Sequence, residues 1–370
     1  MNRKTLATLF LATAAAIVPV AAPRAAVAAE PAAGAAAAAA AKKKEGLIAG
    51  LGQDKVIVTE KTDAIIKGAL KWLASKQNNN GSWSSDGGQE HQVAMTGYTL
   101  MAFMSAGHLP DEGEYGKNVT AGMNFLLNCV KPDGFIQAGG GTNMYEHGIA
   151  TIALAELYGQ TRDARLKPKL EAAIRLIVNC QNDQGGWRYP PRVSDADISV
   201  TVLQVVALRA AKNSGLDVPA RTIERAVSYV RSCYDENSGG FTYQPRNRQP
   251  GFARTAAAIY SLQVCGEYDD PRVKRGSEYL ARKRGERQWF TYGNFYAAPA
   301  QYMIGGKTWE DWYGWVSEAI VKNARKQGDL VTWEPNTMDD NGGQGGRLYC
   351  TAVYTAILAM PYHYVPLYQR

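Results

Sequence analysis

Two carboxylates and two guanidinium groups lie close together in the middle of the chain. Asp195 and Asp197 are separated by one residue, and Arg188 and Arg192 precede them. A pair of carboxylates can divide the roles of general acid and general base, and a neighbouring arginine can hold an anionic group of the substrate. These four residues indicate one candidate chemistry, the cleavage of a polysaccharide by a lyase or a hydrolase.

A second set of candidates occupies the same predicted position in five apolar segments. Threonines recur about one helical turn into these segments, at Thr96, Thr151, Thr201, Thr255 and Thr351. Four residues earlier, the side chains differ in chemistry: Gln92, His147, Asp197, Gly251 and Arg347. Varied residues on a repeated frame are typical of a site built on a scaffold, so we expect these five at one rim. Helix capping, for example by Asp197, is the alternative interpretation.

Tyrosines also recur on the apolar segments, at Tyr98, Tyr145, Tyr260, Tyr296, Tyr349 and Tyr354. Aromatic rings facing a lumen can stabilise a cation or pack against an isoprenoid chain. At helical spacing, the same residues are also typical of an ordinary core. We take Tyr98, Tyr296 and Tyr349, together with Gln92 and Arg347, as candidate ligand-binding residues.

A repeated unit of about fifty residues carries all these candidates. Each copy has a helix-like run, a turn with glycine and an aromatic residue, and a second helix-like run. The turns are Gly81-Ser82-Trp83, Gly134-Phe135, Gly185-Gly186-Trp187 and Gly239-Gly240-Phe241, with weaker copies at Trp289-Phe290 and Trp333. A fixed period of this length predicts stacked units that bury their apolar faces on one another.

The two runs of each copy differ in polarity. Residues 172–180 are mixed, for example, whereas residues 200–211 are almost wholly apolar. This difference predicts an all-α fold in which about six helical hairpins form an inner apolar ring and an outer mixed ring, an α/α toroid. An open solenoid of helix pairs is the alternative, because its local pattern is the same.

The N-terminal residues have the features of an export signal. A positive start is followed by an apolar stretch from Leu6 to Val20, and small residues precede Glu30. We therefore expect a signal peptide over 1–29, an Ala/Lys-rich tether and lead-in over 30–59, and the toroid over 60–370. The mature protein would be periplasmic or secreted and have no transmembrane segment; a retained anchor is the alternative.

Charge and cysteine usage limit the function classes further. The formal charge is +7, residues 1–29 contribute three of the positive charges, and the rest are spread along the chain, which does not favour nucleic acid as a partner. Three of the five cysteines, Cys129, Cys180 and Cys233, recur before the turns of successive copies. That placement favours buried thiols at packing positions over disulfides.

Two of the copies resemble a known family. Lys67-Gly68, Trp72-Leu73, Gln77 and Gly81-Ser82-Trp83 match the QW motif of the terpenoid cyclases, and the segment from Gln181 to Trp187 matches it again. The chain is similar over about residues 60–366 to the superfamily of squalene–hopene cyclases and protein prenyltransferase β-subunits. This resemblance implies an α/α toroid. A glutamine at the helix end can hydrogen-bond the turn backbone and tie neighbouring hairpins together.

The resemblance also implies candidate catalytic residues. The class II cyclases use Asp-x-Asp-Asp, whose middle aspartate protonates the substrate, and the matching stretch here is Asp195-Ala196-Asp197-Ile198. Asp197 would then be the acid, with Asp195 and His147 as partners, acting on an isoprenoid. The last aspartate of the motif is replaced by Ile198, which argues against proton-initiated cyclisation.

Other motifs of related toroids are missing. No cysteine has an aspartate two residues before it, as the zinc site of the prenyltransferases requires, so we expect no metal and no cofactor. Cys265-Gly266-Glu267-Tyr268 has a tyrosine where a thioester needs glutamine. We therefore expect an exported toroid that binds an apolar ligand, such as an isoprenoid, or a protein partner. A terpenoid-cyclase-like enzyme using Asp197 and a polysaccharide lyase or hydrolase are the alternatives.

Overall fold

The computed structural model describes residues 55–85, 91–139, 143–247, 249–341 and 345–368, which belong to one compact unit. The predicted signal peptide and most of the predicted tether lie outside the described residues. Within the described ranges, almost all regular structure is helical.

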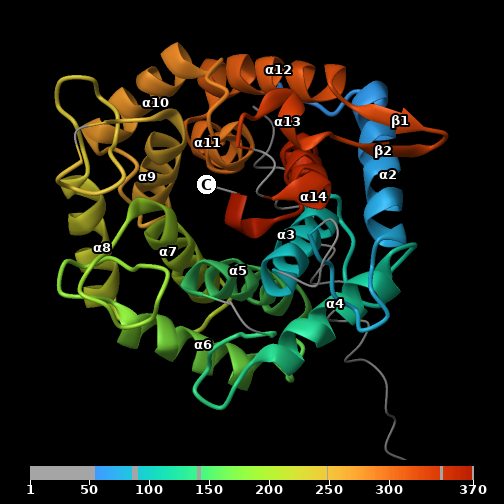
Figure 1. Cartoon of the computed structure of the whole chain (residues 1–370), viewed down its shortest axis with the longest axis horizontal. Helices are drawn as coiled ribbons and strands as arrows, with labels where there is room; N and C mark the ends of the chain where they lie inside the picture. The colour runs from blue at the N-terminus through green and yellow to red at the C-terminus, as the bar shows by residue number, and fades with distance from the viewer. Residues whose placement is uncertain (1–54, 86–90, 140–142, 248, 342–344, 369–370) are drawn as a thin grey trace, which may run out of the picture. The chain divides into compact units, whose positions relative to one another are not determined.

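The helices form two concentric rings (Figure 1). The inner ring consists of α3 (Gln92–Ser105), α5 (Met144–Thr161), α7 (Ile198–Asn213), α9 (Phe252–Val264), α11 (Phe290–Ile304) and α14 (Gly346–Ala359). The outer ring consists of α2 (Glu60–Ser75), α4 (Gly116–Cys129), α6 (Leu166–Cys180), α8 (Ala220–Ser232), α10 (Pro271–Lys283) and α12 (Gly306–Lys322). The α/α toroid predicted from the repeats is confirmed.

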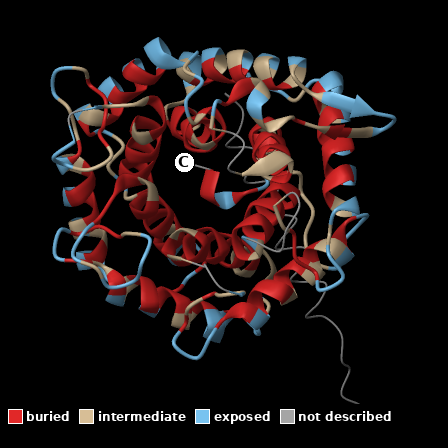
Figure 2. Ribbon diagram, viewed as in Figure 1, coloured by how far each residue is buried: buried red, intermediate tan, exposed pale blue. Residues whose placement is uncertain are grey.

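Polarity explains which helix takes which ring. Along α7 nearly every residue is buried, whereas α8 buries one face and presents charged residues on the other. Figure 2 shows the same difference around the molecule, with the inner helices buried and the exposed residues on the outer helices and loops. An apolar helix is stable only when neighbours cover it on all sides, and the inner ring provides that cover.

Short elements complete the last repeat. The antiparallel strands β1 (Arg325–Gln327) and β2 (Leu330–Thr332) pair with Arg325 opposite Thr332 and lie beside α2. They are followed by α13 (Pro335–Met338), and the chain ends in two single turns, η2 (Met360–Tyr362) and η3 (Pro366–Tyr368).

The aromatic turns attach each inner helix to its outer partner. The indole nitrogens of Trp83, Trp187 and Trp333 donate to backbone carbonyls at the ends of outer helices, at 2.7, 2.8 and 2.7 Å. The glutamines before the Trp83 and Trp187 turns, Gln77 and Gln181, reach further. Gln181 Nε2 donates to the carbonyls of Gly185 and of Thr222 in the next outer helix. Each such glutamine therefore links two neighbouring hairpins.

The second repeat corrects the predicted register. In three repeats a threonine hydroxyl accepts the amide of the turn residue: Thr96 from Trp83, Thr201 from Trp187 and Thr255 from Phe241. In the second repeat, His147 Nδ1 accepts the amide of Ile136 at 3.2 Å. His147 therefore takes the threonine position and Thr151 lies one turn later. The buried turn residue is Ile136 rather than Phe135.

The first and last hairpins meet, so the ring is closed and the open-solenoid alternative is wrong. Helix α14 packs against both α2 and α3. The hydroxyl of Tyr362 donates to Asp63 at 2.5 Å, and a Cβ on Gly68 would lie 2.6 Å from the side chain of Val331. The absence of a side chain at Gly68 lets β2 approach α2 closely.

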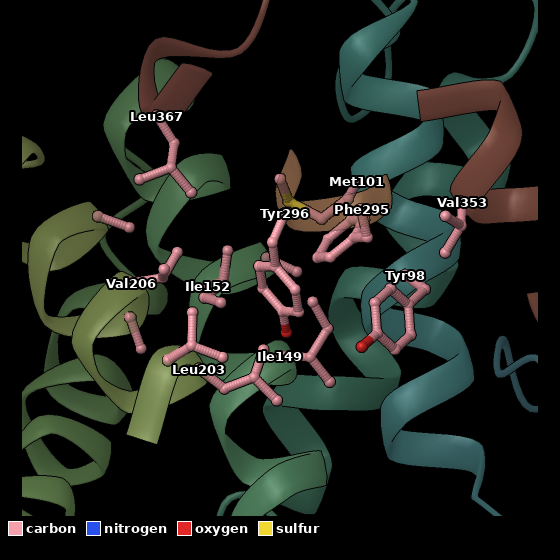
Figure 3. Close-up of a cluster of buried hydrophobic side chains, with 14 of the residues drawn as sticks. Tyr98, Met101, Ile149, Ile152, Leu203, Val206, Phe295, Tyr296, Val353 and Leu367 are labelled. Carbon is pink, nitrogen blue, oxygen red and sulfur yellow. The ribbon is translucent and has the colours of Figure 1, made fainter. Parts of the chain in front are cut away.

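The middle of the ring is filled by side chains rather than open. Apolar residues from α3, α5, α7, α11 and α14 converge there (Figure 3). Leu367, from the terminal turn η3, joins them beside α7. Its backbone amide donates to the buried carboxyl of Glu156 near the end of α5, at 3.5 Å. The C-terminal segment thus covers the end of the ring where the inner helices finish.

Candidate functional site

A cavity of about 500 Å³ lies at the opposite end, where the inner helices begin. Most residues that line it are N-caps or belong to the first two turns of inner helices, and the loops before α7, α9 and α14 supply the others. This volume and a largely aromatic lining are typical of a small-molecule site.

Tyrosines form the walls of this central cavity. Tyr98 from α3 and Tyr145 from α5 join their hydroxyls at 2.8 Å, and the ring of Tyr349 from α14 meets that of Tyr98 edge to face at 4.9 Å. Tyr292 from α11 lies 6.5 Å from Tyr145 between ring centroids. Burial raises the pKa of all four phenols, so they offer neutral hydroxyls and ring faces to a ligand.

A histidine–carboxylate pair spans α3 and α5 at the cavity. His91 Nδ1 lies 2.9 Å from Glu146 Oε1, and both residues line the space. Asn143 places the glutamate, because its side-chain oxygen accepts the amides of Tyr145 and Glu146 and so caps α5. The glutamate side chain is 5% exposed and the histidine 48%, so the imidazole lies on the open side of the pair.

The far wall carries Asp339, Arg254 and Trp289. Asp339 is buried and accepts the amides of Thr291 and Asn341, which fixes its carboxylate at the start of α11. Arg254 lies in the first turn of α9, and its guanidinium donates to the carbonyl of Gln249. Opposite charges therefore occupy different parts of this wall.

Two N-caps at the cavity have strained backbones. His91 and Trp289 have φ angles of 56° and 59°, in the left-handed region that L-residues with large side chains avoid. Each costs about 1–3 kcal/mol relative to a relaxed residue. Strain of this kind is retained where the surrounding structure fixes a side chain, and both side chains line the central cavity.

Asp197 is the N-cap of α7. Its Oδ1 accepts the amide of Val200 at 2.9 Å and its Oδ2 accepts Arg188 at 3.0 Å, and the residue is fully buried. Burial raises its pKa, against the opposing effects of the Val200 amide and the Arg188 charge. Asp197 does not line the central cavity; Tyr189 and Tyr243, which flank Arg188, do. The capping interpretation describes its contacts, and an acid role would need a route past these tyrosines.

Asp195 is about half exposed. It accepts Gln244 Nε2 at 2.8 Å and lies 3.4 Å from Arg188 Nε. Arg188 thus joins the two aspartates, but the group faces the loops before α7 and α9 rather than the central cavity. The predicted grouping of Asp195, Asp197 and Arg188 occurs in space. It serves to hold loops, and it does not make an open acidic cleft.

Of the five residues predicted at one rim, all but His147 lie at the starts of inner helices. Gln92 and Arg347 bond to Ser84 and Glu334, and Gly251 is the N-cap of α9. His147 is fully buried one turn deeper than expected, and burial lowers its pKa to about 4. None of these four residues, nor Asp197, lines the central cavity. The predicted rim residues and the central cavity thus lie at the same end of the ring, but these residues do not line the cavity.

Tyr98 and Tyr349 do line the central cavity, and Tyr296 lies one turn further along α11, against Tyr292 at 5.0 Å between ring centroids. The sequence reasoning missed His91, Glu146, Arg254 and Asp339. Three of these are N-caps or first-turn residues of apolar segments. Their shared feature in the sequence is a polar side chain within three residues of the start of an apolar segment.

Across the described ranges, no group of three or more His, Cys, Asp or Glu residues is placed to hold a metal ion. None of the five cysteines, all of which lie in the described ranges, forms a disulfide. Four of them are buried, and Cys129, Cys180 and Cys233 lie at the ends of outer helices. No helix in the described part of the chain combines the length and apolarity needed to span a bilayer.

The sequence model of a family described as "Prenyltransferase alpha-alpha toroid domain" matches residues 50–223 and 188–293, which together are more than half of the chain. The chain belongs to this family. Among the curated proteins no sequence matches this toroid.

Solved structures with related rings act on quite different substrates. An α-1,6-mannanase of Salegentibacter sp. has a TM-score of 0.63 and 8% identity, and the match covers 82% of this chain and 100% of the mannanase. A type II terpene cyclase from Scytonema, in complex with geranylgeranyl dihydroxybenzoate, has a TM-score of 0.56 and 13% identity, covering 84% and 100%. The cellobiose 2-epimerase of Bacillus thermoamylovorans has a TM-score of 0.60 and 12% identity, and the match covers 82% of this chain and 98% of the epimerase. At these identities, the likeness establishes the fold alone.

Proposed function

We propose that this toroid is an exported binding protein whose central cavity takes a small molecule with a largely apolar body. The observation that carries the proposal is the tyrosine-walled cavity of about 500 Å³ at the start of the inner helices. Ring faces from α3, α5, α11 and α14 surround an apolar ligand, while the hydroxyls and Asn143 can orient a polar group on it. An isoprenoid fits this chemistry, and export would follow from residues 1–29.

Direct binding tests this function. We expect the purified protein to bind an uncharged isoprenoid, farnesol, in isothermal titration calorimetry. Ser199 lines the central cavity from the first turn of α7, so Ser199→Phe should fill part of the space and abolish binding. Ser228 is exposed on the outer helix α8, and Ser228→Phe is the matched control that should bind as the wild type does. Equal binding by both variants, or no binding by the wild type, would contradict the proposal.

Export has its own test. When the gene is expressed with its leader, mass spectrometry of the secreted or periplasmic protein should find an N-terminus near Glu30. Recovery of an intact leader in the membrane fraction would instead support the retained anchor.

A second candidate function is carbohydrate cleavage, and one pair of residues favours it. Glu146 and His91 place a buried carboxylate and an exposed imidazole together in the central cavity, as general acid–base chemistry requires. The test is the release of reducing ends from polysaccharides, α-1,6-mannan among them, by the wild type and by Glu146→Gln. Activity that Glu146→Gln abolishes would favour this enzyme, and no release by the wild type would remove it.

A further inference from the structure

Helix α10 and the turn after it concentrate positive charge on one part of the ring. Residues 271–287 contain seven Lys and Arg and two Glu, so this segment has a formal charge of +5. The whole chain carries +7, of which residues 1–29 contribute three, and everything outside these two segments therefore sums to −1. The even spread of charge expected from the sequence is wrong for this segment.

These cations lie on the outside of the toroid. Helix α10 is placed between α8 and α12 in the outer ring (Figure 1), and it packs its buried face against α9. Five exposed cations follow one another along the helix and its C-cap, and we call them the basic strip: Lys274, Arg275, Arg282, Lys283 and Arg284. Thirteen residues of α-helix give the strip a length of about 20 Å.

Most of the charge of the basic strip is not neutralised by neighbours. Within the described ranges, no carboxylate lies within 4.0 Å of the side-chain nitrogens of Lys274, Arg282 or Arg284. Arg275 lies 3.7 Å from Glu236, and Lys283 lies 4.0 Å from Glu286. Exposed ion pairs of this kind contribute about 0–1 kcal/mol, so an anionic ligand can replace them at little cost.

The neighbouring elements hold the guanidinium groups of the strip in place. Arg275 Nη2 donates to the Glu236 carbonyl at 3.0 Å, and Arg282 Nη2 donates to the Ser238 carbonyl at 2.9 Å. The guanidinium of Arg284 lies over the ring of Trp315 on α12, 5.9 Å from its centroid. A guanidinium has five N–H donors, so each of these retains several for a ligand. Side chains that are already held lose less conformational entropy on binding.

The surroundings of the strip favour a narrow, linear polyanion over a membrane or a nucleic acid. Asp311 and Glu318 are exposed on the adjacent helix α12, where a broad anionic bilayer would meet them. Among the described residues, the large apolar side chains that are exposed are Ile57, Tyr189 and Tyr364, and none of them lies on α10 or α12. The strip therefore has no exposed ring or aliphatic group to enter a bilayer or to stack on bases.

We propose that the basic strip docks the toroid onto an acidic polysaccharide, whose carboxylate or sulfate groups pair with the arginines of the strip. Arginine suits this role because its planar fork binds such groups through two parallel hydrogen bonds. No residue of the strip lines the central cavity, so this contact is separate from the proposed binding of an apolar ligand.

A matched pair of polymers tests the docking. Dextran sulfate and dextran share one backbone and differ in their sulfate groups. In calorimetry at pH 7 and low salt, the wild type should bind dextran sulfate and should not bind dextran. Raising NaCl to about 0.5 M should weaken the binding, because salt screens exposed charges.

Two triple variants with the same change in net charge locate the contact. The test variant replaces three cations of the strip: Lys274→Gln, Arg282→Gln and Arg284→Gln. The control replaces three exposed cations of the outer helix α6: Lys167→Gln, Lys169→Gln and Arg175→Gln. The test variant should bind dextran sulfate roughly tenfold more weakly than the wild type, whereas the control should bind as the wild type does. If the test variant has a lower thermal transition, Lys274→Glu replaces it.

The outcomes are distinct. Equal losses in the two triple variants would show that binding follows net charge alone, and the strip would be wrong. No binding of dextran sulfate by the wild type, or binding that 0.5 M NaCl leaves unchanged, would also overturn the proposal. Phosphatidylglycerol vesicles and duplex DNA are the competing probes. Tighter binding to either of them than to dextran sulfate, lost in the test variant, would assign the strip to a membrane or to nucleic acid instead.

Discussion

Glu156 on α5 accepts a hydrogen bond from the backbone amide of Leu367, 211 residues further along the chain. The glutamate is 3% exposed, and burial raises its pKa to about 8. Tyr260 and Tyr368 lie near it, and Arg209 on α7 lies near Tyr260. A neutral carboxyl therefore holds the terminal segment against the end of the ring.

This relationship predicts alkaline destabilisation. The unfolded glutamate has a pKa of 4.5 and the folded one about 8, so the folded state holds the proton more tightly. Its contribution is complete below pH 4.5 and is lost as the pH rises through 8. Urea unfolding should show Glu156→Gln to be roughly 2–5 kcal/mol more stable than the wild type at pH 9, with little difference at pH 5. Glu224→Gln, on the exposed face of α8, is the control. Parallel pH profiles of wild type and Glu156→Gln would contradict the prediction.

His147 predicts the opposite dependence at acid pH. Burial lowers its pKa from 6.5 to about 4, so its stabilising contribution is complete above pH 6.5 and is lost as the pH falls through 4. His147→Thr restores the hydroxyl found in the other repeats and should cost about 1–3 kcal/mol at pH 7, because the ring volume is lost. Between pH 6.5 and 4, this variant should lose less stability than the wild type in circular-dichroism melts. Thr201→Ala removes the same type of bond without a titrating group, and it should shift stability equally at every pH. A wild type with no extra acid sensitivity would refute the assignment.

The contacts of Gln181 predict that one side-chain amide stabilises the packing of two neighbouring hairpins. Its Nε2 donates to Gly185 and Thr222, at 2.9 and 2.8 Å. Gln181→Ala should lower the free energy of unfolding by about 1–3 kcal/mol, because two carbonyls lose their donor. Gln184 is exposed in the same turn and makes one bond, to Ser194. The expected cost of Gln184→Ala is below about 0.5 kcal/mol. Equal losses in the two variants would show that the link between hairpins carries no special weight.

Asp197 allows a capping role to be distinguished from an acid role. Asparagine keeps an acceptor for the Val200 amide, so Asp197→Asn should cost about 1–2 kcal/mol. Asp197→Ala removes the acceptors of both the Val200 amide and the buried contact with Arg188, and should cost about 3 kcal/mol or more. Incubation with squalene and with allylic diphosphates should yield no product from the wild type or from Asp197→Asn. A product formed by the wild type and lost in a well-folded Asp197→Asn would restore the cyclase interpretation.

The ring could be predicted from the sequence because the repeat and the difference in polarity between paired helices are strong, long-range features. The register of the second repeat could not. His147 and Thr151 are four residues apart, and a shift of one helical turn leaves the apolar face of α5 unchanged, so the pattern fits either alignment. Only the bond between His147 and Ile136 fixes it.

The central cavity could not be predicted from the sequence for a related reason. Its volume depends on which side chains fall short of the ring axis, and Ala94, Ser199 and Gly345 are small where their neighbours are large. Tyr98 would have been an inner-ring residue in any alignment. His91 and Trp289 line the space only because their backbones adopt a left-handed conformation that their residue types disfavour.

Closure between α2 and α14 has a consequence for synthesis. Chains fold from the N-terminus as they leave the ribosome, yet the surface of the opening hairpin is completed by the helix that emerges last. During synthesis, the apolar surface of α2 and α3 that α14 later covers stays exposed until the last repeat has emerged. A premature stop in the sixth repeat would remove α14 and expose the apolar surfaces of both the first and the fifth hairpins, because a smaller closed ring would not form.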